Sequence, residues 1–294
     1  MTPLFLALVL AQEGPAARSG VGAAKIGSKA YIVGGSQERD GAFVRDLLSY
    51  DIAARKWADL AMLPEYIAFP VVEAYAGRLY VFGGLHRDGS VCNHSWVYDP
   101  TPDRFTALAP LPTPRSRASG AVVNGKIAVI GGIDADNINS NRVELYDPTN
   151  KTWSRIEPLQ VSRHGQTSAF AKDAIIVLGG YSGNPMEQTT DVEVWKPNQG
   201  WKTASPMPHI RGFASTVVYD GKVYVFGTRG GAEHPSIYDP ATDLWTESKA
   251  KDVPRHRGAV IEHGGRAYFF FGEEHGGKPI AVFDLARDAW IDRF

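Results

Sequence analysis

A short sequence pattern occurs six times in this chain of 294 residues. Each copy has a run of β-branched and aliphatic residues that ends in two glycines, then an aromatic residue followed by Asp, and a large aromatic residue five or six positions later. The glycine pairs, or what remains of them, begin at steps of 49, 48, 48, 48 and 45 residues, at Gly34, Gly83, Gly131, Gly179, Gly227 and Gly272. A repeat of about 20–50 residues indicates structural units that are stable only beside their neighbours. The sequence therefore predicts one domain of six similar units, a length that closed all-β folds commonly reach.

The third copy shows the strands of one unit most clearly. Two apolar runs flank Asn124-Gly125, a dipeptide that is the strongest short signal for a β-hairpin. Residues 142–146 alternate between polar and apolar, as a half-buried strand does, and a fourth strand follows the turn that begins at Asp147. Four antiparallel strands in about 48 residues form one blade of a β-propeller. We therefore predict an all-β, six-bladed propeller with four antiparallel strands in each blade.

This pattern resembles the kelch repeat over residues 17–294. The departures are local: Trp195-Lys196-Pro197 in the fourth copy, Gly227-Thr228 in the fifth and Gly272-Glu273 in the sixth. The resemblance implies a kelch-type propeller with blades at about 17–62, 66–110, 114–158, 162–206, 210–250 and 254–294. The glycines and aromatic residues then serve packing rather than chemistry. Because the first copy begins on its innermost strand and the last ends on its outermost one, we expect the first and sixth blades to pack together without exchanging strands.

Residues 1–12 are apolar and have two interpretations. Val9-Leu10-Ala11 is similar to the cleavage site of a signal peptide, although no basic residue precedes the apolar run. The same residues would also suit an extra N-terminal strand. We prefer the signal peptide, which predicts a secreted or periplasmic protein; otherwise the protein is cytoplasmic. The run is too short to span a bilayer, and we expect no membrane span after it.

Charge and cysteine content exclude several classes of partner and cofactor. A net charge of −1 gives no basic field, so we expect no nucleic-acid partner. The single Cys92 excludes an internal disulfide framework and a cysteine zinc cluster, and the histidines lack the short spacing of a zinc site. Cys92 and His94 together suggest a copper site or a reactive thiol, but copper oxidases with kelch-type propellers need further domains. We therefore predict no metal and no cofactor.

Basic residues recur sixteen positions before the first glycine of each pair. They are Arg18, Arg115, Arg163, Arg211 and His256, the last flanked by Arg255 and Arg257, while the second copy has Ile67. These residues begin the innermost strands, so we expect them to surround the mouth of the central channel, with His164 beside them and Glu273 and Glu274 on a loop at the same face. A ring of guanidinium groups would attract carboxylates or phosphates. Alternatively, each arginine is structural and pairs with backbone carbonyls or with an acidic residue of a loop.

Two functions fit this sequence. The first is a recognition module, predicted to be a monomer, that binds an anionic small molecule or an acidic protein segment at the channel mouth. The second is an enzyme acting on carbohydrate, because the size and architecture of the chain resemble those of N-acetylneuraminate epimerases. That resemblance implies that Arg163 and Arg211 clamp a carboxylate, while Glu273, Glu274 or a rim histidine transfers the proton. No catalytic motif is recognisable, and we prefer the recognition module.

Overall fold

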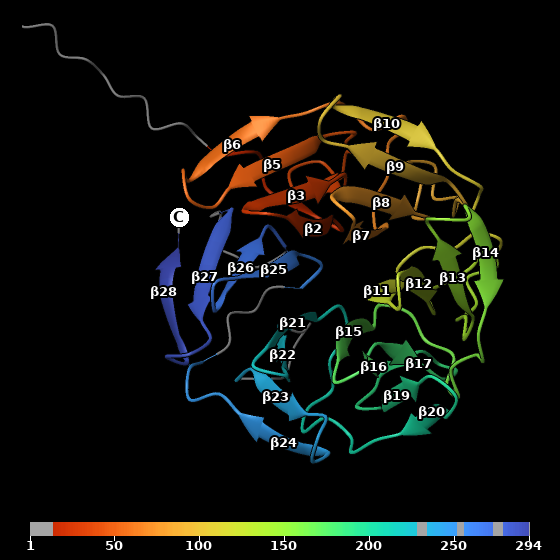
Figure 1. Cartoon of the computed structure of the whole chain (residues 1–294), viewed down its shortest axis with the longest axis vertical. Helices are drawn as coiled ribbons and strands as arrows, with labels where there is room; N and C mark the ends of the chain where they lie inside the picture. Colours follow the sequence, from red (N-terminus) through yellow and green to blue (C-terminus); the bar gives the residue numbers. More distant parts are fainter. Residues whose placement is uncertain (1–13, 228–233, 252–255, 273–278, 294) are drawn as a thin grey trace, which may run out of the picture.

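The computed structural model describes residues 14–227, 234–251, 256–272 and 279–293. These residues form six four-stranded antiparallel sheets, arranged like blades around a central axis (Figure 1). The predicted all-β, six-bladed propeller is therefore confirmed. The two interpretations of residues 1–12 lie outside the described residues. No helix in the described part of the chain is long and apolar enough to cross a membrane.

The first three blades follow one another along the chain, each running from the axis outwards. Blade 1 comprises β2 (Gly22–Ile26), β3 (Lys29–Val33), β5 (Leu47–Asp51) and β6 (Lys56–Asp59). Blade 2 comprises β7 (Val71–Tyr75), β8 (Arg78–Phe82), β9 (Ser95–Asp99) and β10 (Arg104–Ala107). Blade 3 comprises β11 (Ser119–Val123), β12 (Lys126–Ile130), β13 (Val143–Asp147) and β14 (Thr152–Arg155).

The other three blades complete the circle in the same order. Blade 4 comprises β15 (Thr167–Ala171), β16 (Ala174–Leu178), β19 (Val192–Lys196) and β20 (Gly200–Thr203). Blade 5 comprises β21 (Ser215–Tyr219), β22 (Lys222–Phe226), β23 (Ser236–Asp239) and β24 (Leu244–Glu247). Blade 6 comprises β25 (Ala259–His263), β26 (Arg266–Phe270), β27 (Ile280–Asp284) and β28 (Ala289–Arg293).

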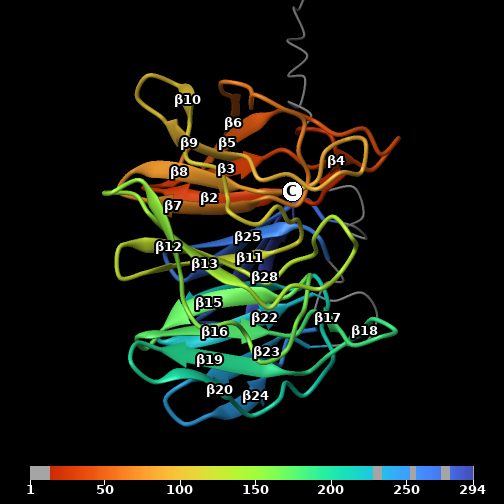
Figure 2. The same ribbon diagram turned by 90° about the vertical axis from the view of Figure 1, so that its right-hand side faces the viewer.

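In blades 1 to 4 the loops after the second strands lie on one face of the ring. In blade 1 this loop contributes β4 (Ser36–Gln37), which pairs with β1 (Arg18–Ser19) just before the innermost strand. In blade 4 it carries a short hairpin of β17 (Tyr181–Ser182) and β18 (Glu187–Gln188). Figure 2 shows the blades from the side, with β4, β17 and β18 towards the same edge. The pairing of Ser19 with Ser36 places the starts of the innermost strands on this face too. We call it the loop face.

Turn chemistry explains the regular hairpin within each blade. Between β11 and β12, Asn124 and Gly125 have φ values of 48° and 76°. Two successive residues with positive φ match the right-handed twist of the flanking strands, so the hairpin needs only these two residues. The strand β12 that follows is apolar from Ile127 to Ile130, and those four residues are fully buried.

Aromatic side chains fill the space between neighbouring blades. At the junction of blades 2 and 3, Phe82 contacts Tyr146 and Trp153 with ring centroids 5.5 and 5.1 Å apart. In the described residues the apolar core divides into six such clusters, each shared by two adjacent blades. The predicted packing role of these aromatic residues is therefore confirmed.

The register of the sixth copy differs from the sequence prediction by one residue. Phe271 and Gly272 have φ values of 56° and 95°, which match the 60° and 95° of Gly179 and Gly180. Phe271-Gly272, rather than Gly272-Glu273, is thus the counterpart of the glycine pair. The pattern was misread because a phenylalanine occupies a left-handed conformation that usually selects glycine. The residue sixteen positions earlier is then Arg255, not His256.

Blades 1 and 6 close the ring by packing, as we expected. Each four-stranded sheet takes all its strands from its own copy of the repeat, so blades 1 and 6 do not exchange strands. The amide of Gly272 donates to the carbonyl of Arg18 at 3.0 Å, and Trp57 contacts the rings of Phe270 and Phe271. Near the axis, Lys25 forms an ion pair with Glu262 at 3.7 Å.

Candidate functional site

Six residues with left-handed backbone conformation surround the channel at the loop face. One precedes each innermost strand, and their φ values lie between 52° and 66°. In order they are Gly20, Phe69, Arg117, Gly165, Phe213 and Arg257. We call this set the mouth ring. Its members follow the order Gly-Phe-Arg twice, so the ring has approximate two-fold symmetry.

The backbone of the mouth ring forms a closed circle of hydrogen bonds. Each amide donates to the carbonyl of the preceding member, and the amide of Gly20 donates to Arg257 across the blade 1–6 junction at 2.7 Å. The remaining five bonds measure between 2.6 and 3.4 Å. Because only backbone atoms take part, this circle fixes the positions of the six Cα atoms whatever side chains they carry.

The side chains of the mouth ring enclose a cavity of about 100 Å³. Phe69 and Phe213 meet with ring centroids 5.9 Å apart. The guanidinium carbon of Arg117 lies 5.2 Å from the Phe69 ring centre, and that of Arg257 lies 4.9 Å from the Phe213 ring centre. Two cations therefore stack on an aromatic surface at the end of the channel, an arrangement that favours the charged form of each guanidinium.

The two arginines make the cavity electropositive. Burial, and then the charge of Arg257, lower the pKa of Arg117 below its usual value. In the part of the chain that the structure describes, no carboxylate forms an ion pair with Arg117. Burial and the same two arginines lower the pKa of His164 to about 4, so this histidine is neutral at pH 7. It stacks on Tyr181 with ring centroids 5.3 Å apart, and its Nδ1 lies 2.6 Å from Asn139 Oδ1.

The arginines that the sequence placed at the channel mouth are instead buried. Arg115, Arg163 and Arg211 are 1%, 0% and 1% exposed, and Arg18 is 3% exposed. Their guanidinium groups turn into the blades, so the prediction that they line an accessible site needs correction. The alternative interpretation, in which each arginine pairs with carbonyls or with an acidic residue, describes their contacts.

The hydrogen bonds of these arginines explain why they turn inwards. Arg163 donates to the carboxylate of Glu193 at 2.6 Å and to the carbonyls of Gly179 and Asp191 at 3.2 and 3.1 Å. A buried cation is tolerated only when it is paired and its donors are satisfied. Arg163 thus stabilises the loop after the glycine pair of its own blade. Equivalent pairs join Arg115 to Glu144 at 2.6 Å and Arg18 to Asp46 at 3.0 Å, and Arg211 donates to the carbonyls of Gly227 and His234 and to the hydroxyl of Ser236.

The other predicted site residues divide into two groups. His256 is 2% exposed, and Arg257 belongs to the mouth ring. Arg255, Glu273 and Glu274 lie outside the described residues. The sequence indicated that Arg257 and Arg117 lie beside the channel mouth, but it did not indicate Phe69 or Phe213, which occupy the same position in other blades. The signal that would have found them is the position two residues after each member of the basic series, or after Ile67 in the second copy.

A carboxyl group lies in the innermost layer of blade 2. Glu73, on β7, contacts the next blade so closely that a Cβ on Gly120 would lie 2.6 Å from its Oε1. Burial raises the pKa of Glu73 to about 7. Among the described residues no cation pairs with it. Glu73 is therefore a titratable group in the inner layer of the propeller.

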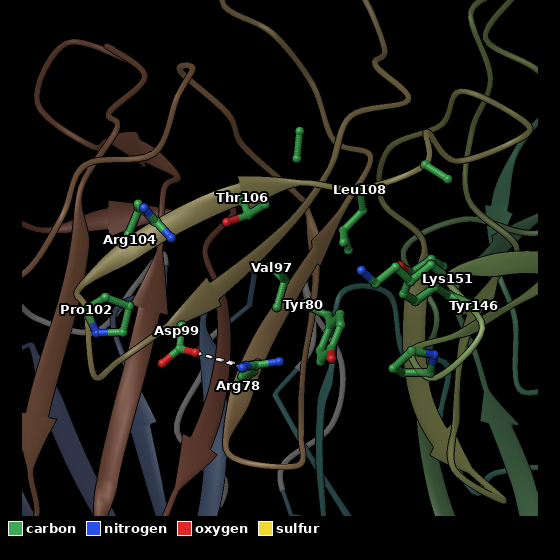
Figure 3. A pocket seen from close by; sticks show the side chains of 13 residues that line it. Arg78, Tyr80, Val97, Asp99, Pro102, Arg104, Thr106, Leu108, Tyr146 and Lys151 are labelled. Carbon is green, nitrogen blue, oxygen red and sulfur yellow. Dashed lines mark hydrogen bonds and ion pairs between the residues drawn. The ribbon is translucent and has the colours of Figure 1, made fainter.

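A larger pocket of about 340 Å³ lies between blades 2 and 3, at the turns opposite the loop face (Figure 3). Arg78 and Asp99 form an ion pair there at 3.0 Å, which neutralises both. Arg104 and Lys151 extend from exposed turns.

Three potential metal ligands meet on the loop of blade 2. One ligand atom from each of His86, Cys92 and His94 lies within 4.8 Å of the other two. The sequence had indicated Cys92 and His94 as a possible copper site, but not His86, because His86 lacks a short spacing to the other two. The antiparallel bridge between Leu85 and Val91 reverses the chain, so that His94 lies beside His86.

The geometry described so far defines a closed six-bladed β-propeller of the repeat type. A family model described as the KLHDC2/KLHL20/DRC7 Kelch-repeats domain matches residues 6–180, so the chain belongs to the kelch-repeat family. The solved "Structure of YjhT" superposes with a TM-score of 0.82 at 17% identity, over 95% of this chain and 98% of that one. At this identity the likeness shows the fold alone.

Two curated proteins are similar over shorter stretches. Kelch repeat and BTB domain-containing protein 8 of Danio rerio is 27% identical over 93 residues, which cover 31% of this chain and 15% of that protein. Beta-scruin of Limulus polyphemus is 33% identical over 76 residues, covering 24% of this chain and 8% of that protein. The matched stretch is thus a small part of each relative.

Proposed function

We propose that this protein is a kelch-repeat recognition module that binds an acidic side chain of a partner protein in the mouth ring. The carboxylate would lie between Arg117 and Arg257 and above the rings of Phe69 and Phe213. The observation that carries the proposal is the pair of arginines stacked on these rings around one cavity. The proposal keeps the predicted anionic ligand and moves its site from the buried arginines to the mouth ring.

Backbone strain in the mouth ring supports a role in binding. Arg117, Arg257, Phe69 and Phe213 have positive φ, which costs a non-glycine residue roughly 1–2 kcal/mol. The same backbone conformation is adopted by glycine at the two other positions, so the fold itself does not require large side chains there. Strained residues of this kind concentrate at functional sites.

The size of the cavity favours a side chain over a whole sugar. Pockets for small molecules usually measure about 300–1,000 Å³, whereas the described residues enclose about 100 Å³. A single carboxylate with its adjoining methylene groups is of the right size. The alternative of a sugar-acid enzyme has less support, because Arg163 and Arg211, which would hold the carboxylate of the sugar acid, are buried and already hydrogen-bonded.

A peptide-binding experiment tests the proposal. A fluorescein-labelled oligoglutamate peptide is titrated with the protein by fluorescence anisotropy, beside an oligoglutamine peptide of the same length. We expect the glutamate peptide to bind more tightly and to lose affinity as salt is added, because the interaction is between charges. Replacement of Arg117 by glutamine should weaken binding by about tenfold or more.

Arg104→Gln is the matched control, because Arg104 is an exposed arginine at the opposite face. It should bind the glutamate peptide as the unchanged protein does. Equal affinity for both peptides, or an unchanged affinity in Arg117→Gln, would contradict the proposal. Saturable binding of N-acetylneuraminate with faster anomer exchange would instead support the carbohydrate enzyme.

A further inference from the structure

We propose that the loop of blade 2, residues 83–94, binds one zinc ion through His86, Cys92, His94 and Glu65. The first three ligands belong to the loop itself, and Glu65 belongs to the connection between blades 1 and 2. The site is separate from the mouth ring and independent of the proposed binding of acidic side chains. Zinc bound here would link this loop, through Glu65, to the connection between blades 1 and 2.

The distances from Glu65 to the two imidazoles are close to those of a tetrahedral zinc site. Glu65 Oε2 lies 3.5 Å from Nδ1 of His86 and 3.2 Å from Nδ1 of His94. Zinc bonds of about 2.0–2.3 Å to nitrogen, oxygen and sulfur place tetrahedral donors about 3.3–3.7 Å apart. The carboxylate and imidazole atoms already have this separation. The three loop ligands lie within 4.8 Å of one another, so rotations that move an atom by about 1 Å complete the site.

One of the donor atoms is enclosed and lacks a hydrogen bond. His94 Nδ1 has no hydrogen-bond partner in the described structure, although a carboxylate oxygen lies 3.2 Å away outside hydrogen-bonding geometry. A buried polar atom without a partner is unfavourable and calls for a ligand or an ion. Zinc placed between His94 and Glu65 would coordinate both atoms.

The charges and donor types also suit zinc. A cysteine thiolate and a carboxylate together balance the charge of a divalent ion, and two neutral imidazoles complete four ligands. Cys92 is a free thiol and is 5% exposed, whereas His86, His94 and Glu65 are more accessible. Mixed nitrogen, sulfur and oxygen donors favour zinc over magnesium or calcium, which prefer oxygen alone.

The loop is held in place without the metal. The isolated bridge between Leu85 and Val91, and hydrogen bonds from the amide of His86 to Ser90 and from the amide of Cys92 to Gly84, fix its backbone. Little conformational freedom is therefore lost on binding. A cavity beside Glu65 and His86, of about 500 Å³, gives the ion access from solvent.

In blade 3 the buried cation of Arg115 lies beside the position that corresponds to Cys92, whereas blade 2 has no arginine at the corresponding place. Ser140 occupies the place of Cys92 in blade 3, and its hydroxyl lies 3.4 Å from the guanidinium of Arg115. In blade 2 the corresponding arginine is replaced by Ile67, which is fully buried. A metal cation beside Cys92 therefore meets no buried positive charge from this position.

Cobalt and zinc titrations of the full chain test the site. After chelator treatment and buffer exchange, Co²⁺ is added and the absorption of a thiolate–cobalt charge-transfer band is followed. We expect one Co²⁺ per chain, displacement of the band by Zn²⁺ and a higher melting temperature with Zn²⁺. Cys92→Ser should abolish the band, and His86→Ala should weaken zinc binding by about 100-fold or more.

The controls separate metal binding from folding. Serine is accommodated at the equivalent position of blade 3, and His86 is partly exposed, so both variants should remain folded. His209→Ala removes an exposed histidine that pairs with Glu247 at 2.6 Å, and it should bind Co²⁺ as the unchanged protein does. Absence of the thiolate band, or zinc affinity that is unchanged in both Cys92→Ser and His86→Ala, would overturn the proposal.

Discussion

Arg115 and Arg155 bind the same carboxylate, that of Glu144, in opposite surroundings. Arg115 and Glu144 are both enclosed, with Nη2 and Oε2 2.6 Å apart. Arg155 reaches Oε1 at 3.1 Å from the surface, where 58% of its side chain is exposed. A buried charge left without its partner is far more costly than an exposed one, because water cannot replace the lost interaction. The pair therefore offers an internal comparison of buried and exposed contacts.

We expect Arg115→Ala to lower the free energy of unfolding by about 3–5 kcal/mol, because Glu144 then loses its buried cation. Arg155→Ala should lower it by less than about 1 kcal/mol. Urea unfolding of the two variants measures the difference. Similar small losses would mean that Arg115 is not structural, and the original prediction of an accessible arginine ring would regain support.

The protonation of Glu73 should make stability depend on pH. Burial raises its pKa from 4.5 to about 7, so the folded protein binds a proton that the unfolded chain releases between these values. The stability that the protonated group contributes is therefore present below about pH 4.5 and is lost as the pH rises through 7. Glu73→Gln should be more stable than the unchanged protein by about 1–3 kcal/mol at about pH 8, and equal to it near pH 4. Parallel stability curves for the two proteins would contradict this assignment.

At this scale the sequence located the arginines but not the direction of their side chains. Arg115 and Arg117 are two positions apart, yet one enters the blade and the other enters the channel mouth. The choice depends on Glu144 and on the loop carbonyls, which belong to other strands of the blade. Spacing along the chain contains no information on these partners.

The glycine pair is the element that joins each blade to the next. The amide of its second glycine donates to the carbonyl of the following blade, as Gly180 does to Arg211 at 2.8 Å. The first glycine lies against the same carbonyl, because a Cβ added to Gly179 would be 2.3 Å from the oxygen of Arg211. The pair thus combines a left-handed conformation with a close approach of two backbones.

Replacement of Gly179 by alanine should therefore push blades 4 and 5 apart, with a loss of more than about 2–3 kcal/mol in the free energy of unfolding. Gly200→Ala is the matched control, because Gly200 has a φ of 69° and no atom within 4 Å of an added Cβ. Its loss should be limited to the backbone strain, about 1–2 kcal/mol. Chemical unfolding compares the two, and equal losses would show that the close approach is not important.

Strands and turns could be predicted from the sequence because their signals are local. The Asn124-Gly125 turn and the alternation in β13 depend on residues a few positions apart. The register of the sixth copy could not be predicted, because Phe271 has the conformation of a glycine and is held there by contacts with Arg18 and Trp57 from blade 1. Contacts between the two ends of the ring have no signature within either repeat.

Closure of the whole propeller depends on one junction that has no covalent connection. Blades 1 and 6 share an apolar cluster in which Phe270 contacts Tyr50 and Trp57, with ring centroids 5.8 and 5.7 Å apart. Phe82 occupies the equivalent place between blades 2 and 3, which the chain connects directly. Both phenylalanines are fully buried.

We expect Phe270→Ala and Phe82→Ala to lose similar stability, about 3–5 kcal/mol each. Only Phe270→Ala should open the ring below the global transition, because the chain still connects blades 2 and 3. Native-state hydrogen exchange should show this as faster exchange of the Gly20 and Gly272 amides, which bridge blades 1 and 6. Faster exchange in both variants to the same extent would contradict a special role for this junction.

The repeated Gly-Phe-Arg order of the mouth ring has a consequence for any ligand that lacks such symmetry. After half a turn about the propeller axis, the six ring side chains present the same chemistry, so an acidic segment finds two poses of similar energy. What separates the poses lies next to the ring, where His164 precedes Gly165 but Ser19 precedes Gly20. The polarity of a bound chain would then be decided by these neighbours, while the ring itself would supply affinity without direction.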